Sequence, residues 1–402
     1  LFLPPQVPPE IVIMSKRHRQ IISFLCTCFC FCSIAKAQQP VLRDSAISPA
    51  IIEMANTIIN STRDSSLLLI GDITIHGNRK TKPYIIEREI AFKQGEYIKG
   101  NELQKKLELT QQQVMNTALF TSVIVYVESI QGNMLFINID VKERIYLLPL
   151  PYFKLIDRNF NQWWVEQKAS IDRVNYGLKF QYNNVTGRND KMAVNLIAGY
   201  SRQILLKYEQ PFADRQLKHG YSVSFSFSRQ RELNYGSSLS KQVFYKQDNF
   251  VLQNIRAEVA YLYRPAVRTR HAVRFAYVSG AVSDTVLKLN PNYYPGDGKT
   301  KITYPEFSYS IQHFNMDYNA YPTRGVYAEA TIMRRGLGGL VNLTQLSFQG
   351  SYTFPVANKL YLHLQGAGII KVPFNQPFVN QQVFGYGGPF FRGLEYYVFD
   401  GA

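Results

Sequence analysis

The sequence predicts two consecutive parts, a small α+β module and then an antiparallel transmembrane β-barrel. Three observations support this expectation. An N-terminal export signal is followed by a compact run of strand and helix patterns. Residues from about 152 to 372 then alternate polar and apolar side chains, with no further helical pattern. The chain also contains 27 Tyr and 26 Phe, and the two aromatic girdles of a membrane barrel require many such residues.

Residues 14–37 have the pattern of a secretory signal peptide. Basic residues at 16–19 precede an apolar run at 21–34, and Ala35-Lys36-Ala37 fits the small-x-small cleavage rule. The mature chain is expected to begin near Gln38, and residues 1–13 are interpreted as an upstream extension that is not native to the protein. The apolar run is shorter than the ~18 residues of a helix that spans a membrane.

All four cysteines, Cys26, Cys28, Cys30 and Cys32, lie inside that apolar run. Their spacing could bind a metal, and Cys32 could carry a lipid, although no small residues precede it. A signal peptide is the interpretation that we favour over both. The mature chain then contains no cysteine, and its stability cannot depend on a disulfide.

The formal charge of +16 indicates an anionic neighbour. An exported protein is a poor match for nucleic acid, so phosphate-rich lipid headgroups are the better partner. The alternative is a basic lumen with no specific partner. The mean hydropathy of −0.17 is compatible with a barrel, because alternating strands average to neutral values.

Residues 67–148 predict a compact α+β module of order strand, helix, helix, strand, strand, after a polar linker at 38–66. The first strand, 67–76, places Leu69, Ile73 and Ile75 on one face and stops at a Gly-Asn turn. Pro83 suits the first turn of a helix, and Asn101 is the expected N-cap of the second. Strands at 122–128 and 134–142 complete the module.

Three segments of this module, 75–81, 86–89 and 116–123, carry a resemblance to a known family. Gly77 and Asn78 follow the first strand, and Leu119 and Phe120 follow the second helix. In this order they resemble the motifs of a POTRA domain, the periplasmic module of the BamA/TamA superfamily of outer-membrane assembly and export proteins. The resemblance implies structural roles for Leu119 and Phe120, and a free strand edge that receives extended clients. Strand 122–128 is the candidate edge; the alternative is an edge that is only solvated, or covered by the linker.

After Pro149 and Pro151 the helical signals vanish, and eleven strands are expected. A soluble sandwich is the alternative, but strand length, the apolar face and the export signal favour a barrel in lipid. The expected strands lie near 152–168, 173–182, 190–200, 203–211, 219–230, 251–263, 270–282, 301–314, 324–335, 341–354 and 358–371. If the module is periplasmic, the two longest connections, 231–250 and 283–300, both fall outside, as is typical of outer-membrane barrels.

The barrel region carries a second resemblance to the same superfamily. The segment Tyr208 to Phe212 and the turn containing Asp317, Pro322 and Gly325 resemble recurring barrel turns. Near the end of the chain, Phe391-Arg392-Gly393-Leu394 resembles the V-R-G-F/Y signature. The resemblance implies that this loop lies in the lumen, with Arg392 held by acidic and aromatic groups of a later strand; the alternative is a turn with an exposed Arg. The family has sixteen strands, so residues 149–402 are interpreted as an incomplete barrel.

No enzymatic motif was found, and neither a catalytic residue nor a cofactor nor a metal site is expected. The resemblance implies an outer-membrane assembly, insertion or translocation factor, with its POTRA module in the periplasm. Its implied partners are unfolded client proteins, outer-membrane lipid and accessory assembly proteins. A passive porin-like channel is the main alternative. A barrel that secretes a fused enzyme is another, for which residues 38–66 leave no room.

Overall fold

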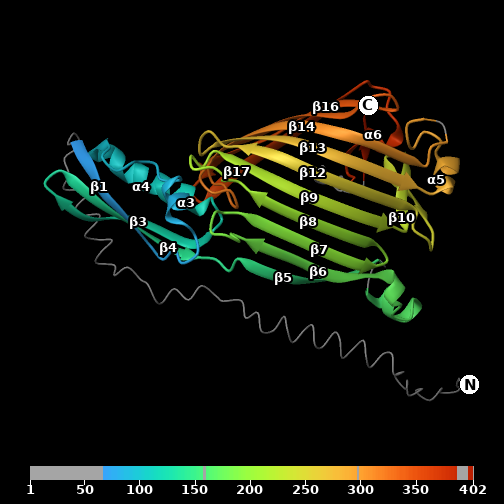
Figure 1. Cartoon of the computed structure of the whole chain (residues 1–402), viewed down its shortest axis with the longest axis horizontal. Coiled ribbons are helices and arrows are strands. Elements are labelled where there is room, and N and C mark those ends of the chain that lie inside the picture. The colour runs from blue at the N-terminus through green and yellow to red at the C-terminus, as the bar shows by residue number, and fades with distance from the viewer. Residues whose placement is uncertain (1–66, 157–159, 297, 387–396, 402) are drawn as a thin grey trace, which may run out of the picture. The chain divides into compact units, whose positions relative to one another are not determined.

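The computed structural model describes residues 67–156, 160–296, 298–386 and 397–401. All of them belong to one compact unit. They form two large sheets, which we call the N-terminal module, 67–143, and the barrel sheet, 147–372 (Figure 1). Two small two-stranded sheets accompany them: a hairpin at 232–246, and β18 (Gln382–Phe384) paired with β19 (Phe399–Asp400). No helix within the described ranges is both long and apolar enough to cross a membrane.

The N-terminal module is a four-stranded sheet of order β2-β1-β4-β3 that packs against two helices. The predicted order of strand, helix, helix, strand, strand is confirmed, with one short extra strand, β2, between the helices. Its elements are β1 (Leu67–His76), α3 (Pro83–Glu87), β2 (Tyr97–Lys99), α4 (Gly100–Met115), β3 (Phe120–Gln131) and β4 (Met134–Glu143). Strand β3 ends the sheet and pairs only with β4 among the described residues, so the expected edge strand is confirmed as an edge.

Two details of the module differ from the sequence prediction. Helix α4 begins at Gly100 with Lys99 as its N-cap and no side-chain cap, so Asn101 lies inside the first turn. In β1 the buried residues are Leu68 and Ile70, whereas Leu69 is only half-buried. The register of β1 against β4 shifts between Ile70 and Ile73, and a bulge reverses which alternate residues face the core.

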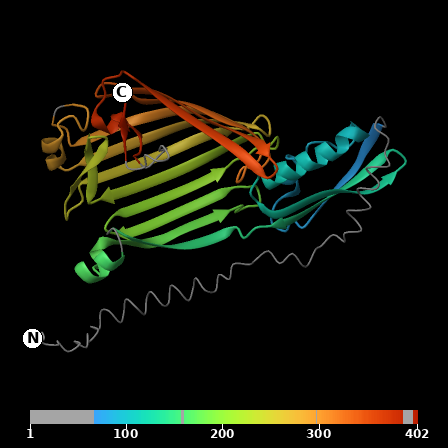
Figure 2. The same cartoon turned by 180° about the vertical axis from the view of Figure 1, so that it is seen from behind.

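The barrel sheet contains eleven strands, the number that the sequence predicts. Each pairs antiparallel with its neighbour in the order β17-β16-β15-β14-β13-β12-β9-β8-β7-β6-β5. The strands are β5 (Leu147–Leu155), β6 (Val174–Asn183), β7 (Lys191–Gly199), β8 (Arg202–Gln210), β9 (His219–Gln230), β12 (Leu252–Tyr263), β13 (Thr269–Val282), β14 (Lys301–Met316), β15 (Gly325–Gly338), β16 (Val341–Ala357) and β17 (Leu360–Val372). Strands β5 and β17 each have one neighbour in the sheet. Figure 2 shows these end strands, in green and orange-red, separated across the curved sheet.

The first predicted barrel strand, 152–168, agrees with the structure only at 152–155, because the observed strand begins earlier, at Leu147. Strand β5 ends at Leu155, and a π-helix spans Gln162–Glu166. Trp163 is buried in this segment, with Phe160 and Trp164 packed around its ring. Its indole nitrogen donates to the Ser170 carbonyl at 2.9 Å. Packing of aromatic side chains against one another therefore overrides the strand pattern there.

The two faces of the barrel sheet differ in chemistry. One face exposes large apolar side chains that adjoin across strands, such as Leu178 beside Leu196 and Phe275 beside Phe307. The opposite face carries polar side chains, among them the buried Ser222, Glu306 and Ser310. Outward apolar and inward polar faces are the arrangement of a barrel in lipid. We call the polar face the lumen face.

Connections at the two ends of the barrel sheet differ in length. One end carries only short connections. We call four of them the inner turns, 184–190, 211–218, 264–268 and 317–324, which join β6 to β7, β8 to β9, β12 to β13 and β14 to β15; a fifth, 358–359, joins β16 to β17. The opposite end carries the three longest connections, which join β5 to β6, β9 to β12 and β13 to β14, together with two-residue turns at 200–201 and 339–340. Strands β10 (Glu232–Ser238) and β11 (Lys241–Lys246) form a hairpin, and helix α5 spans Asp284–Leu289.

Candidate functional site

The N-terminal module contacts all four inner turns, and this junction is the candidate functional site. At the first turn, the Lys82 amide donates to the Gly187 carbonyl at 3.0 Å, and the Asn184 side chain donates to the Thr81 hydroxyl at 2.9 Å. At the fourth, the Asn116 side-chain amide donates to the Asp317 carbonyl at 2.8 Å. Since the module is periplasmic in the predicted topology, these turns mark the inner end of the barrel, and the longer connections lie outside.

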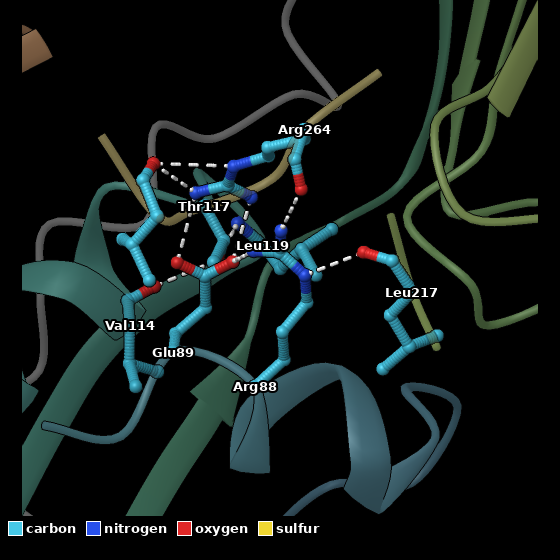
Figure 3. A network of polar contacts seen from close by, with 8 residues as sticks. Arg88, Glu89, Val114, Thr117, Leu119, Leu217 and Arg264 are labelled. Carbon is cyan, nitrogen blue, oxygen red and sulfur yellow. Dashed lines mark hydrogen bonds and ion pairs between the residues drawn. The ribbon is translucent and has the colours of Figure 1, made fainter. Parts of the chain in front are cut away.

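Three charged side chains form the centre of the junction, which we call the junction network (Figure 3). Glu89 directly follows the C-cap of α3, and its side chain is only 2% exposed. Arg264, in the third inner turn, binds it with two nitrogens, at 2.7 and 3.0 Å. Arg88 binds the same carboxylate at 2.9 Å. Such fork-to-carboxylate contacts are among the stronger hydrogen bonds in proteins.

Arg88 also ties the network to two inner turns through their backbone. It donates to the Leu217 carbonyl at 2.7 Å and to the Arg264 carbonyl at 3.0 Å. Burial, together with the nearby Arg264 guanidinium, lowers the pKa of Arg88, although Glu89 opposes this shift. The Glu89 carboxylate therefore offsets the repulsion between two close, largely buried guanidinium groups at the junction, and the cost of burying them.

The second inner turn also contributes to the hydrophobic core of the module. Phe212 is buried and packs in one cluster with Ile85, Val114 and Phe120. The Arg88 and Arg264 guanidinium groups lie 4.7 and 5.7 Å from its ring centre. A barrel residue thus completes the module's core, and cation–π contacts join that core to the junction network.

The four motif residues of the module have structural positions. Gly77 has φ +87°, and a Cβ there would lie 2.0 Å from the Val141 carbonyl oxygen, so only glycine fits. The Asn78 side chain donates to the Thr81 carbonyl at 3.1 Å. Leu119 and Phe120 are buried in the core cluster. Gly77 and Asn78 thus shape the loop that reaches the first inner turn.

The predicted barrel motif forms the fourth inner turn. The Asp317 carboxylate accepts from the Thr323 amide at 3.0 Å, the Tyr318 amide at 2.9 Å and the Thr323 hydroxyl. Burial raises the pKa of Asp317, but these hydrogen bonds outweigh it and hold the pKa below its usual range. Gly325 closes the turn at φ +126°, and Pro322 is half-buried in it.

The predicted lumen motif, Phe391, Arg392, Gly393 and Leu394, lies outside the described residues. The segment before it does contact the lumen face. Lys371 of β17 donates to the Gln382 carbonyl at 2.8 Å, and Arg335 of β15 donates to Asn380 at 3.1 Å. Arg335 also pairs with Glu306, at 2.8 Å. The connection after β17 thus turns toward the lumen face, while the role of Arg392 stays a prediction.

Sequence reasoning missed the junction network. Arg88 and Glu89 lie in segment 86–89, which carries part of the POTRA resemblance but implies no role for them. Arg264 lies in a short connection between two expected strands. Glu89 and Arg264 are 175 positions apart, so no local pattern connects them. Within the described residues, no group of three or more His, Cys, Asp or Glu could hold a metal ion.

Two family models match the chain. The model described as the Omp85 superfamily domain matches residues 184–396, more than half of the chain. The POTRA model, described as a surface antigen variable number repeat, matches residues 68–144. No protein of curated function matches the sequence.

Several solved structures are similar to the chain at low sequence identity. BamA from Haemophilus ducreyi lacking POTRA domains 1-3 has 14% identity and a TM-score of 0.43, over 80% of this chain and 59% of that one. CdiB from Escherichia coli has 9% identity and a TM-score of 0.43, over 83% and 64%. CdiB from Acinetobacter baumannii has 12% identity and a TM-score of 0.41, over 94% and 69%. The chain thus spans 59% of the length of the BamA chain that it matches.

Proposed function

From the premise that this chain belongs to the Omp85 superfamily, we propose that it inserts client polypeptides into the outer membrane or moves them across it. Its barrel lies in the bacterial outer membrane and its POTRA module in the periplasm. The N-terminal module would bind a client and pass it to the barrel, with client folding as the source of free energy.

One observation carries the proposal: a strand edge is held next to the inner end of the barrel. Strand β3 pairs with β4 alone among the described strands, and an unpaired edge can bind an extended peptide by adding a strand. Contacts to four inner turns hold the module in place. A client on this edge would therefore meet the barrel without a large movement of the module.

A passive channel is the second candidate, and the polar lumen face favours it. Ser222, Glu306 and Ser310 on that face are residues that a water-filled pore could carry. A channel, however, has no use for a buried ion network that fixes a periplasmic module. The two functions predict different behaviour of β3: an insertion or translocation factor binds client polypeptides at this edge, whereas a passive channel does not.

Site-specific photo-cross-linking in living cells tests the proposal. A photoreactive residue at Glu128, exposed on β3, is expected to cross-link to outer-membrane or exported polypeptides. The matched control is Glu108, an exposed glutamate on α4, which should give few adducts. Equal adducts at both positions would contradict edge binding. No adducts, together with normal levels of surface proteins after deletion of residues 67–144, would favour the passive channel.

A further inference from the structure

A large cavity lies where the N-terminal module meets the inner end of the barrel. Its volume is about 920 Å³, within the range of roughly 300–1,000 Å³ that is typical of ligand pockets. Its wall comes from α4, from all four inner turns and from barrel strands that include β13 and β14. We call it the basic cavity, for the reason that follows.

The lining of the basic cavity carries an excess of positive charge. Seven basic residues line it, namely Lys105, Lys191, Arg264, Arg268, Arg270, Arg274 and Arg324. The three acidic residues of the lining are already engaged. Glu89 is bound by Arg264 and Arg88, Glu209 by Lys207 at 2.9 Å, and Asp317 by the donors of its own turn. Seven bases minus three acids leave four positive charges without a counterpart in the lining.

Several of these cations are accessible from the cavity. Lys191 and Arg270 are both exposed, and neither forms one of the close ion pairs found among the described residues. Glu209, opposite Lys191 on β8, is near enough to interact with both electrostatically, but its close ion pair is with Lys207. The Arg270 guanidinium lies 4.8 Å from the centre of the Phe314 ring. Arg274 donates one hydrogen bond, to the Ser310 hydroxyl at 2.8 Å, and has further donors left. A cleft of one charge sign with protein walls focuses its field on an incoming anion.

The spacing of the cations indicates the form of that anion. Arg270 and Arg274 lie four residues apart on β13, on the same lumen face. At a rise of about 3.3 Å per residue their Cα atoms are about 13 Å apart. Acidic side chains at positions i and i+4 of an extended peptide have the same spacing, whereas one phosphate concentrates its charge at a point. The lining also includes Leu109 and Leu262, which suit apolar peptide side chains.

We propose that the basic cavity binds an extended polypeptide segment that carries acidic side chains on one face. This inference rests on the proposed function and names a feature of the client, a segment rich in Asp or Glu that reaches the barrel from the N-terminal module. Arg270, Arg274 and Lys191 would bind its carboxylates.

Fluorescence anisotropy on the full chain in detergent tests the inference. The probe is a short peptide of alternating Asp and Ser with an uncharged dye, and its neutral counterpart has Asn in place of Asp. The test variant combines Lys191→Gln with Arg270→Gln. The matched control combines Arg215→Gln with Lys359→Gln, which removes two exposed cations from turns at the same end of the barrel, outside the cavity.

The acidic peptide is expected to bind the unmodified chain, and the test variant to bind it about tenfold more weakly or worse. The control variant should stay within about twofold, and raising NaCl from about 50 to about 500 mM should weaken binding. Equal binding of the Asn peptide, or equal losses in test and control variants, would overturn the inference. Inorganic pyrophosphate could instead bind more tightly than the acidic peptide and lose this binding in the test variant. That result would overturn the peptide inference and identify the cavity as a phosphate site.

A second readout separates this inference from the proposed function. If clients cross-link at Glu128 but the acidic peptide does not bind, the cavity inference fails and the proposed function stands. If the peptide binds and no client cross-links at Glu128, the cavity binds acidic peptides but edge delivery fails. In the test variant, cross-links at Glu128 could be lost for acid-rich clients and kept for other clients. That result would support both the cavity inference and the proposed function.

Discussion

The N-terminal module and the barrel sheet bury their apolar side chains in different surroundings. In the module, Ile70, Ile86 and Phe120 are essentially inaccessible and pack between helices and sheet. In the barrel sheet, Phe275, Val259 and Leu346 stay 41–51% exposed in the protein itself. The module therefore depends on its own core, whereas the barrel relies on lipid to cover its apolar face. The comparison teaches that apolar substitutions should have different costs in the two sheets.

The largest effect is expected from truncation in the module's core. Phe120→Ala removes a side chain that is 0% exposed, and such cavities cost about 3–5 kcal/mol. Phe275→Ala removes the same atoms from the lipid face. Lipid acyl chains can fill the space there, so this substitution should cost about 1 kcal/mol or less. Hydrogen exchange of the β4 amides and of the neighbouring barrel strands, in the full chain in detergent, measures both. Equal losses would mean that the two sheets are not stabilised differently.

The junction network tests whether the two regions act as one unit. Glu89→Gln leaves Arg88 and Arg264 close together without their carboxylate, and should cost about 2–4 kcal/mol of docking free energy. Glu96 provides the control, because its pair with Lys106 is partly exposed, with side chains 36% and 25% accessible. Glu96→Gln should therefore cost less than about 1 kcal/mol. Proteolysis rates of the third inner turn, 264–268, report the difference; similar rates for both variants would contradict the role of Glu89.

Two glycines allow a similar comparison within the barrel sheet, between an inner turn and a strand. Gly325→Ala places a Cβ about 2.1 Å from the Asn315 carbonyl oxygen at φ +126°, and should cost about 1–3 kcal/mol. Gly366→Ala on β17 meets open space and should be nearly neutral. Urea-dependent unfolding followed by tryptophan fluorescence distinguishes them. A neutral Gly325→Ala would show that the fourth inner turn tolerates another backbone path.

The smallest expected effect concerns the charge of Asp317 in that same turn. Its pKa is lowered in the folded state, so the stability that it contributes is present above its unfolded pKa of about 3.9. That stability is lost as the pH falls through the lower, folded pKa. Asp317→Asn should therefore loosen the turn at pH 7 and match the unmodified chain at strongly acidic pH. A dye on a cysteine at Tyr321, which is 85% exposed, would show this through its anisotropy; a difference that grows toward low pH would contradict it.

The sequence was sufficient for much of the fold, because periodicity reports which face of a local element is apolar. It predicted the order of the module's main elements and the eleven barrel strands. Prediction from the sequence failed where contacts between distant or irregular segments determine the local structure, as at the β1 bulge and in the π-helix around Trp163. The junction network could not be predicted from the sequence for the same reason. Glu89 and Arg264 meet only after both sheets have folded, and neither lies in a pattern that predicts an ion pair.

Docking of the module on the inner turns is the central claim, and a distance measurement between spin labels tests it most directly. Labels at Glu108 on α4 and Tyr321 on the fourth inner turn can be placed specifically, because all four natural cysteines lie at positions 26–32 in the expected signal peptide. The account predicts one narrow distance distribution in the unmodified chain and a clearly broader one after Glu89→Gln. A broad distribution in the unmodified chain, or one that Glu89→Gln leaves unchanged, would contradict it.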